Sequence, residues 1–130
     1  MNKLQQLAAP TGRFFLSLIF VTSGLSKITQ YEGTQGYMEA MGVPGALLPL
    51  VILTEVVGGL AVMLGWKTRY AAFALAGFSA LSALLFHADF SDQSEMTSFM
   101  KNIALAGGFL VIFAQGAGSY AIDNRNKNES

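Results

Sequence analysis

The sequence has 130 residues, of which 52% are hydrophobic and only 12% are charged. Soluble proteins usually carry about twice this share of charge, so eight basic and eight acidic side chains are too few to cover a water-exposed surface. A membrane protein surrounded by a lipid bilayer is therefore expected. The net charge of zero provides no basic field for nucleic acid, and the absence of cysteine excludes disulfides, thiolate metal sites and a cysteine nucleophile.

Four apolar windows are long enough to cross a bilayer as helices, which takes about 20 residues each. They lie near residues 11–28, 45–65, 70–87 and 99–118. A cleaved secretory signal is the competing interpretation of the first window, but Arg13 delays its apolar core and no clear cleavage site follows. The sequence thus predicts one domain over residues 1–130, an all-α integral membrane four-helix bundle.

The distribution of basic residues predicts the orientation of the bundle. With four spans, the N-terminus, the 66–69 turn and the C-terminal tail share one side of the membrane, and six of the eight basic residues fall there. Short loops rich in Lys and Arg stay in the cytoplasm, so both termini are expected to be cytoplasmic. The segments 29–44 and 88–98 are expected to be outer loops. The last seven residues, 124–130, are polar and are expected to fray.

Each predicted helix places at least one ionisable or polar group on a face that also carries small or apolar residues at helical spacing. The four faces are Arg13, Ser17, Phe20, Gly24 and Lys27; Leu48, Glu55, Gly59 and Val62; Phe73, Ala76, Ala80, Ala83 and His87; and Lys101, Leu105, Gly108, Ile112 and Gln115. Small residues allow backbones to approach, so Gly58, Gly59, Gly107 and Gly108 are interpreted as packing positions.

The predicted topology brings Lys27, Glu55, His87, Lys101 and Asn102 toward an outward-opening polar pocket. For the two lysines, extension to the membrane interface is the simpler interpretation. Glu55 has no such exit, because an isolated carboxylate near the bilayer centre costs on the order of 3 kcal/mol. It is expected to pair with Lys27 first or Lys101 second, or else to be protonated. Two secondary candidates are Arg13 and Gln115. No catalytic or metal site is predicted.

The chain resembles the DoxX family of small bacterial inner-membrane proteins over about residues 11–120. The resemblance rests on Arg13, on Gly24-x-x-Lys27, and on three longer stretches. These are Tyr37-Met38-Glu39-Ala40-Met41-Gly42-Val43-Pro44, the run from Glu55 to Gly59, and Lys101-Asn102-Ile103-Ala104-Leu105-Ala106-Gly107-Gly108. It implies four membrane helices and a multi-pass location in the bacterial inner membrane. Some members are linked to redox complexes and others to the assembly of other membrane proteins. Because these roles differ, the resemblance alone does not assign a function.

Three functional hypotheses follow. The first is an accessory protein without catalysis of its own, which binds a membrane partner or a small amphiphile through the outward polar pocket. The second is a subunit of a quinone-linked membrane oxidoreductase, with quinone bound among Phe86, His87 and Lys101 and a redox cofactor supplied by a membrane or soluble partner, since the chain has no cofactor motif. The third is a small proton-coupled transporter using Glu55, which neighbouring lysines disfavour. A homo-oligomer is compatible with each.

Overall fold

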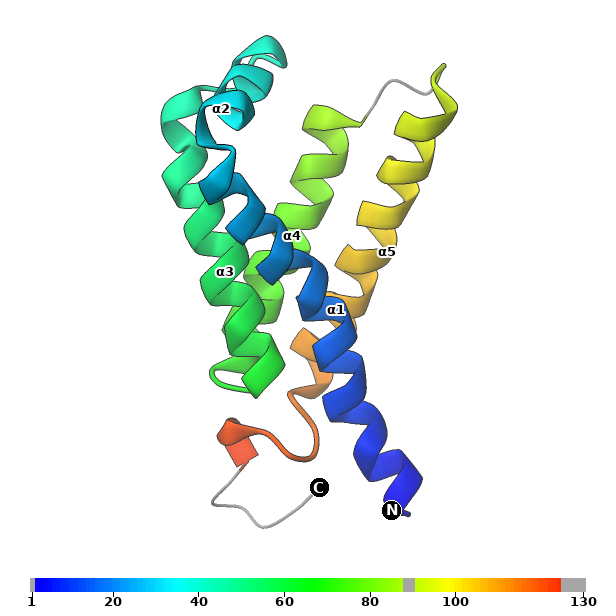
Figure 1. Cartoon of the computed structure of the whole chain (residues 1–130). Helices are drawn as coiled ribbons and strands as arrows, with labels where there is room; N and C mark the ends of the chain where they lie inside the picture. Colours follow the sequence, from blue (N-terminus) through cyan, green and yellow to red (C-terminus); the bar gives the residue numbers. More distant parts are fainter. Residues whose placement is uncertain (1, 88–90, 125–130) are drawn as a thin grey trace.

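Four long helices form the body of the molecule (Figure 1). The computed structural model describes residues 2–87 and 91–124, and it contains only helices, turns and loops in these ranges. The elements are α1 (Lys3–Thr29), α2 (Tyr31–Ala40), the 3-10 helix η1 (Gly45–Leu47), α3 (Leu48–Leu64), α4 (Thr68–Phe86), α5 (Gln93–Gln115) and the 3-10 helix η2 (Ile122–Asn124). Helix α1, the segment Gly45–Leu64, α4 and α5 are long and apolar enough to cross a membrane. The predicted all-α membrane bundle is confirmed.

Two helices begin well before the predicted spans, because each has a side-chain cap. Helix α1 begins at Lys3, where the Asn2 side chain accepts a hydrogen bond from the Gln5 amide at 2.8 Å and the Gln5 side chain accepts one from the Asn2 amide. Helix α5 begins at Gln93 after an Asp92 cap and ends at Gln115. The predicted span 99–118 therefore extends too far, since the chain turns away at Gly116 with a φ of 87°.

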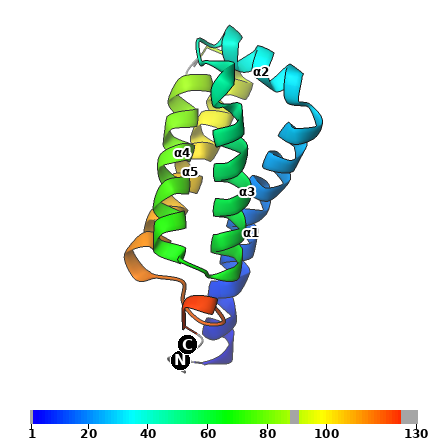
Figure 2. The same cartoon turned by 90° about the vertical axis from the view of Figure 1, so that its left-hand side faces the viewer.

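Helix α2 corrects the expectation of an outer loop over residues 29–44. It is short and contains Gly33 and Gly36, which weaken helix propensity, so its sequence carries no clear helical signal. It lies across the end of the bundle away from the termini (Figure 2). Met38 on its inner face is 4% exposed, so α2 closes that end of the bundle.

Helices α1 and α3 pack tightly along the predicted faces. Arg13, Ser17, Phe20 and Gly24 are the buried residues of α1, and the predicted face of α3 is buried as well. A Cβ atom on Gly24 would lie 2.5 Å from a Val56 methyl carbon, and one on Gly59 would lie 2.9 Å from a Val21 methyl carbon. Both glycines are therefore places where the two backbones come close.

The predicted faces of the other two helices need correction. On α4, Ala76 and Ala83 are buried as expected, but Phe73 is 58% exposed. On α5 the buried residues are Ala106 and Phe109, about one position away from the predicted face. Phe109 packs edge-on against Phe20 of α1, with ring centroids 5.4 Å apart. The large aromatic ring, not the ionisable residues, turns α5 toward the core.

The glycines predicted to be packing positions differ in how close their neighbours lie. Gly58 faces Leu75 and Gly108 faces Leu16, each with a contact a few tenths of an ångström too short for a methyl group. A Cβ atom on Gly107 would have no packing neighbour within 4 Å, so the predicted packing role of this residue is wrong.

A buried guanidinium joins three segments at the end of the bundle that carries the termini. Arg13 is 2% exposed and donates to the carbonyl oxygens of Val62 and Met63, at 3.3 and 3.0 Å, in the last turn of α3. Its other terminal nitrogen donates to the carbonyls of Ser119 and Tyr120, both at 2.9 Å. A cation at a helix C-terminus is favourable, and here it also fixes the segment that follows α5.

The same C-terminal segment repairs two neighbouring helix defects. Pro10 has no amide hydrogen, so the Gln6 carbonyl loses its helical donor, and the Ser119 hydroxyl donates to it instead. Asp123 accepts hydrogen bonds from the Lys67 and Thr68 amides and from the Thr68 hydroxyl, which caps α4. Burial acts to raise the pKa of Asp123, but these bonds prevail and lower it below its ordinary value.

We expect Gly24→Leu to destabilise the protein and Gly107→Leu to leave its stability nearly unchanged. The first side chain would enter the α1–α3 contact, where overpacking costs about 1–3 kcal/mol or more, whereas the second would enter open space. Thermal unfolding of both variants in one detergent measures the difference. Equal melting temperatures for the two variants would contradict the assigned interior.

Candidate functional site

A cavity of about 240 Å³ lies between the helices at the end closed by α2. Helices α1 to α5 and the residue that follows α4 all contribute to its wall, and we call it the outer chamber. Its lining residues are Phe20, Ser23, Lys27, Thr34, Tyr37, Met38, Val51, Phe78, Ser79, Ser82, Phe86, His87 and Asn102. Polar groups thus share the wall with aromatic and aliphatic side chains.

Lys27 points into the bundle and meets Glu55, as the sequence predicts. Its Nζ lies 2.9 Å from Glu55 Oε1 and donates to Ser23 Oγ at 2.6 Å. Side chains on a helix lean toward its N-terminus, so a lysine near the C-terminal end of α1 reaches back into the membrane. The Glu55 side chain is 5% exposed and that of Lys27 is 26% exposed. The ammonium meets Oε1 at an angle unsuited to a hydrogen bond, so this is a contact of charges.

His87 lies in the wall of the outer chamber and has its own carboxylate partner. Its Nδ1 is 2.8 Å from Glu95 Oε1, which comes from the first turn of α5. Beside it, the rings of Tyr37 and Phe86 stack with centroids 5.5 Å apart. Burial, with a smaller contribution from the Glu95 charge, raises the pKa of Tyr37, so its hydroxyl stays protonated at neutral pH.

The structure brings Lys27, His87 and Asn102 to one cavity but leaves Glu55 and Lys101 outside its wall, although Glu55 contacts Lys27. Lys101 is exposed on the outer surface of α5, one residue before Asn102, because the turn of the helix separates their directions. It therefore does not meet Glu55, and the interpretation of an interfacial lysine fits it.

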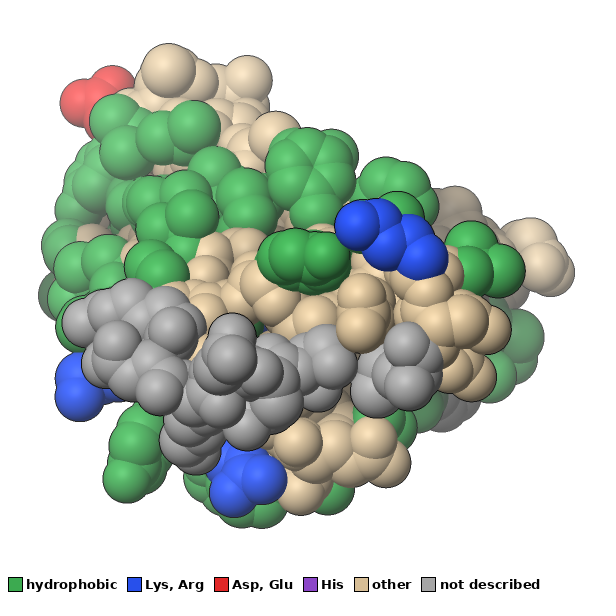
Figure 3. Space-filling view, turned by 90° about the horizontal axis from the view of Figure 1, so that it is seen from below, with side chains coloured by type: hydrophobic (Ala, Val, Ile, Leu, Met, Phe, Trp, Pro, Cys, Tyr) green, Lys and Arg blue, Asp and Glu red, His purple; other side chains and the backbone are tan. Residues whose placement is uncertain are grey.

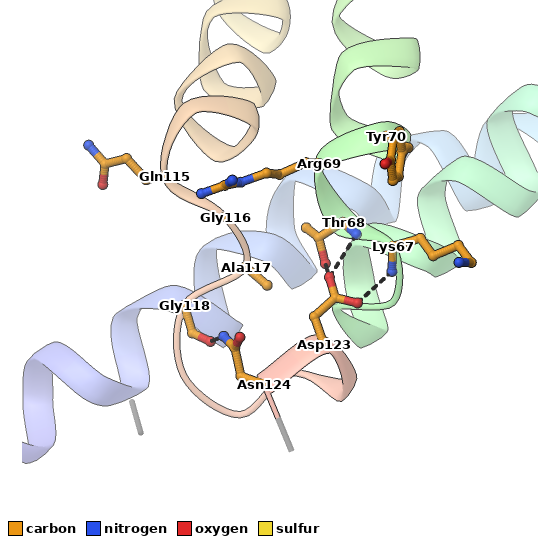
Figure 4. Close-up of a pocket in the computed structure, with 10 residues that line it drawn as sticks. All are labelled: Lys67, Thr68, Arg69, Tyr70, Gln115, Gly116, Ala117, Gly118, Asp123 and Asn124. Carbon is orange, nitrogen blue, oxygen red and sulfur yellow. Dashed lines mark hydrogen bonds between the residues drawn. The ribbon is translucent and has the colours of Figure 1, made fainter. Parts of the chain in front are cut away.

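The two secondary candidates lie at the opposite end of the molecule. Arg13 is engaged by the four carbonyls described above, and Gln115 is exposed at a second pocket of about 620 Å³ (Figure 4). Lys67 and Arg69 also line this pocket, and basic side chains are visible on this end of the molecule (Figure 3). The Asp123 carboxylate in this second pocket already accepts three hydrogen bonds that cap α4. We therefore place the candidate site in the outer chamber.

Several residues of the chamber were not predicted from sequence. Ser79 is 1% exposed, and its Oγ has no hydrogen-bond partner in the described part of the chain. Serine is common in membrane helices and small in size, so it carries no signal without its surroundings. Tyr37 and Met38 were missed because they come from α2, which was expected to be a loop. Groups of three or more metal-binding side chains are not found in residues 2–87 and 91–124.

Removing one partner of the Lys27–Glu55 pair should cost more stability than removing both. A buried charge left without its partner generally costs about 3–5 kcal/mol, and the partial exposure of Lys27 favours the lower end of this range. Melting temperatures of wild type, Glu55→Gln, Lys27→Met and the double variant in one detergent give the coupling free energy. Lys101→Met is the control and should melt like wild type. Additive effects of the two changes would show that the ion pair does not contribute to stability.

The chain is similar in sequence to three known bacterial proteins. Inner membrane protein YqjF of Escherichia coli (strain K12) is 49% identical over 123 residues, which are 95% of each chain. Inner membrane protein YphA of the same organism is 29% identical over 120 residues, 87% of this chain and 86% of its own. CatD of Bacillus subtilis (strain 168), which its name assigns provisionally to the oxidoreductases, is 30% identical over 97 residues, 73% of this chain and 72% of its own.

No solved structure matches the chain significantly. The sequence profile of the DoxX family matches residues 8–88, which include most of α1 and all of α3 and α4. The chain therefore belongs to the DoxX family.

Proposed function

We propose that this protein is an accessory membrane protein that binds a small amphiphile in the outer chamber, without catalysis of its own. The observation that carries the proposal is the wall of that chamber. Hydrogen-bonding groups of Lys27 and Asn102 share it with the rings of Phe20 and Phe78. Few precisely placed polar groups among apolar ones are typical of a site for small organic molecules.

The size of the chamber limits what it can hold. Ligand pockets usually measure about 300–1,000 Å³, and this cavity, at about 240 Å³, is slightly smaller. It therefore suits a compact head group with the rest of the molecule outside. An amphiphile dissolved in the bilayer meets this requirement better than a large soluble metabolite.

A quinone-linked oxidoreductase subunit is the second candidate function. The stacked rings of Tyr37 and Phe86 beside His87 give a flat, partly polar boundary that suits a quinone ring. The name of CatD points in the same direction. In this case a membrane or soluble partner would supply the redox cofactor.

Proton-coupled transport is less favoured. A coupling carboxylate must exchange protons with water on alternate sides, whereas Glu55 is 4% exposed and lies 2.9 Å from a lysine ammonium. That cation also repels a cationic substrate.

Mass spectrometry of the organic extract tests the proposed function. Protein purified in a mild detergent should retain about one equivalent of an amphiphile. Ser23→Phe, which fills the chamber, should lose most of it, while the matched variant Thr22→Phe on the exposed side of α1 should keep it. A quinone in the extract would favour the second candidate. Equal extracts from both variants, or no bound amphiphile in the wild type, would overturn the proposal.

We further propose an inner-membrane location with both termini in the cytoplasm, so that the outer chamber opens on the far side. YqjF and YphA are named inner membrane proteins, and the exposed Lys67 and Arg69 lie at the end of the bundle with the termini.

Reporter fusions test this orientation. A reporter that works only in the cytoplasm should be active when fused after Lys67 or Lys127 and inactive after Asp92. The reverse pattern would place the chamber on the cytoplasmic side.

A further inference from the structure

An apolar groove continues from the outer chamber between α3 and α4. It measures about 200 Å³ and shares five wall residues with the chamber. The shared residues are Met38, Val51, Phe78, Ser82 and Phe86. Two spaces with so much common wall are neighbours, so only these five residues separate a head in the chamber from a tail in the groove.

The groove faces the lipid. Leu50 on α3 and Leu81 on α4 line it and are 59% and 55% exposed, on the surfaces that a bilayer would cover. Apart from Thr54 and Ser82, its wall consists of hydrophobic side chains. An apolar chain can therefore lie in this groove and remain in contact with the hydrocarbon of the bilayer.

The chamber offers hydrogen-bond donors with little net charge. The Lys27 ammonium is compensated by Glu55 at 2.9 Å, and the His87 ring already contacts Glu95 at 2.8 Å. A phosphate or carboxylate head would bring a charge that no free cation of the chamber wall balances, and burying such a charge is costly. Donors without net charge fit a neutral head with carbonyl, ester or ether oxygens.

One donor lies deep in the chamber and has no partner. The Ser79 hydroxyl is buried without a hydrogen bond to any described residue, eight residues before His87, or roughly 12 Å along α4. Ser17 Oγ and Arg13 Nε are likewise buried without a partner in the described residues, but Ser79 lies in the wall of a cavity, where an acceptor on a ligand can reach its hydroxyl. The Lys27 and Asn102 donors come from other helices of the wall, α1 and α5, so a compact head with more than one oxygen can meet donors on different sides of the chamber.

We propose that the chamber and the groove form one site for a single-chain amphiphile with a neutral, oxygen-bearing head, which enters from the bilayer between α3 and α4. This inference rests on the proposed function and adds the ligand class and the route. Acylglycerols and isoprenoid quinones share the required chemistry.

Photolabelling of the purified full-length protein tests the site. The probe is a monoacylglycerol with a photoreactive group in the middle of its chain, and labelled residues are mapped by mass spectrometry. The specific labelling is the part that excess unlabelled monoacylglycerol removes. It should concentrate on residues 47–54 of η1 and α3 and on residues 81–85 of α4. Thr54→Phe, which fills the groove, should reduce it several-fold, and Leu60→Phe on the exposed side of α3 should not.

Competition tests the head group. A monoacylglycerol or an isoprenoid quinone should displace the probe at a concentration about tenfold below that of lysophosphatidic acid of equal chain length. The better of the two neutral competitors identifies the source of the head group. Stronger displacement by lysophosphatidic acid would overturn the neutral ligand class.

Ser79→Ala separates a ligand contact from a structural role. Without ligand its melting temperature should equal or exceed that of wild type, because the lost hydroxyl has no partner in the described chain. Its affinity for the neutral probe should fall about two- to tenfold, the value of one hydrogen bond. Unchanged affinity would remove Ser79 from the site.

The outcomes also separate this inference from the proposed function. Competed labelling confined to chamber residues, with none in the groove, overturns the shared site and leaves the chamber as a binding site. Labelling spread over all exposed helix faces, without competition, overturns both.

Discussion

The buried face of α1 is the constraint on which the rest of the structure depends. A cation near each end of this face meets α3, Arg13 at the carbonyls of its last turn and Lys27 at Glu55 in its middle. Between them Gly24 and Gly59 let the backbones come close. In a bilayer, apolar surfaces gain little from leaving lipid, so polar contacts and close packing must define how two helices meet. The two cations fix both the register and the direction of α1 against α3.

That arrangement also determines where the interior can be open. At the terminal end the C-terminal segment occupies the space, because Ser119 and Tyr120 present carbonyls to Arg13 and Asp123 caps α4. At the other end α2 lies across the bundle and covers it with Met38, without filling the space between the helices. The end with the C-terminal segment therefore holds the helices together, and the outer chamber lies at the opposite end, under α2.

The sequence predicts the fold and a few residues of the chamber wall for a clear physical reason. A charge inside a membrane helix is costly, so its position on the helical wheel shows which face is buried, and this reasoning gives the face of α1 and the Lys27–Glu55 pair. The same reasoning fails for Lys101, since a charge near a helix end can reach the interface and does not determine the face. On α5 the packing of Phe109 decides instead.

What the sequence does not predict depends on contacts between distant segments. Helix α2 forms with two glycines because Met38 gains burial against the bundle, and local propensity contains no trace of that gain. Pro10 would be expected to disturb α1, but Ser119, more than one hundred residues later, supplies the missing donor. The opposite situation holds at Ser79, whose hydroxyl has no such partner among the described residues. Ser17 Oγ and Arg13 Nε are also buried without a partner among these residues, but Ser79 alone of the three lines the chamber, and this position makes its hydroxyl an indication of a ligand.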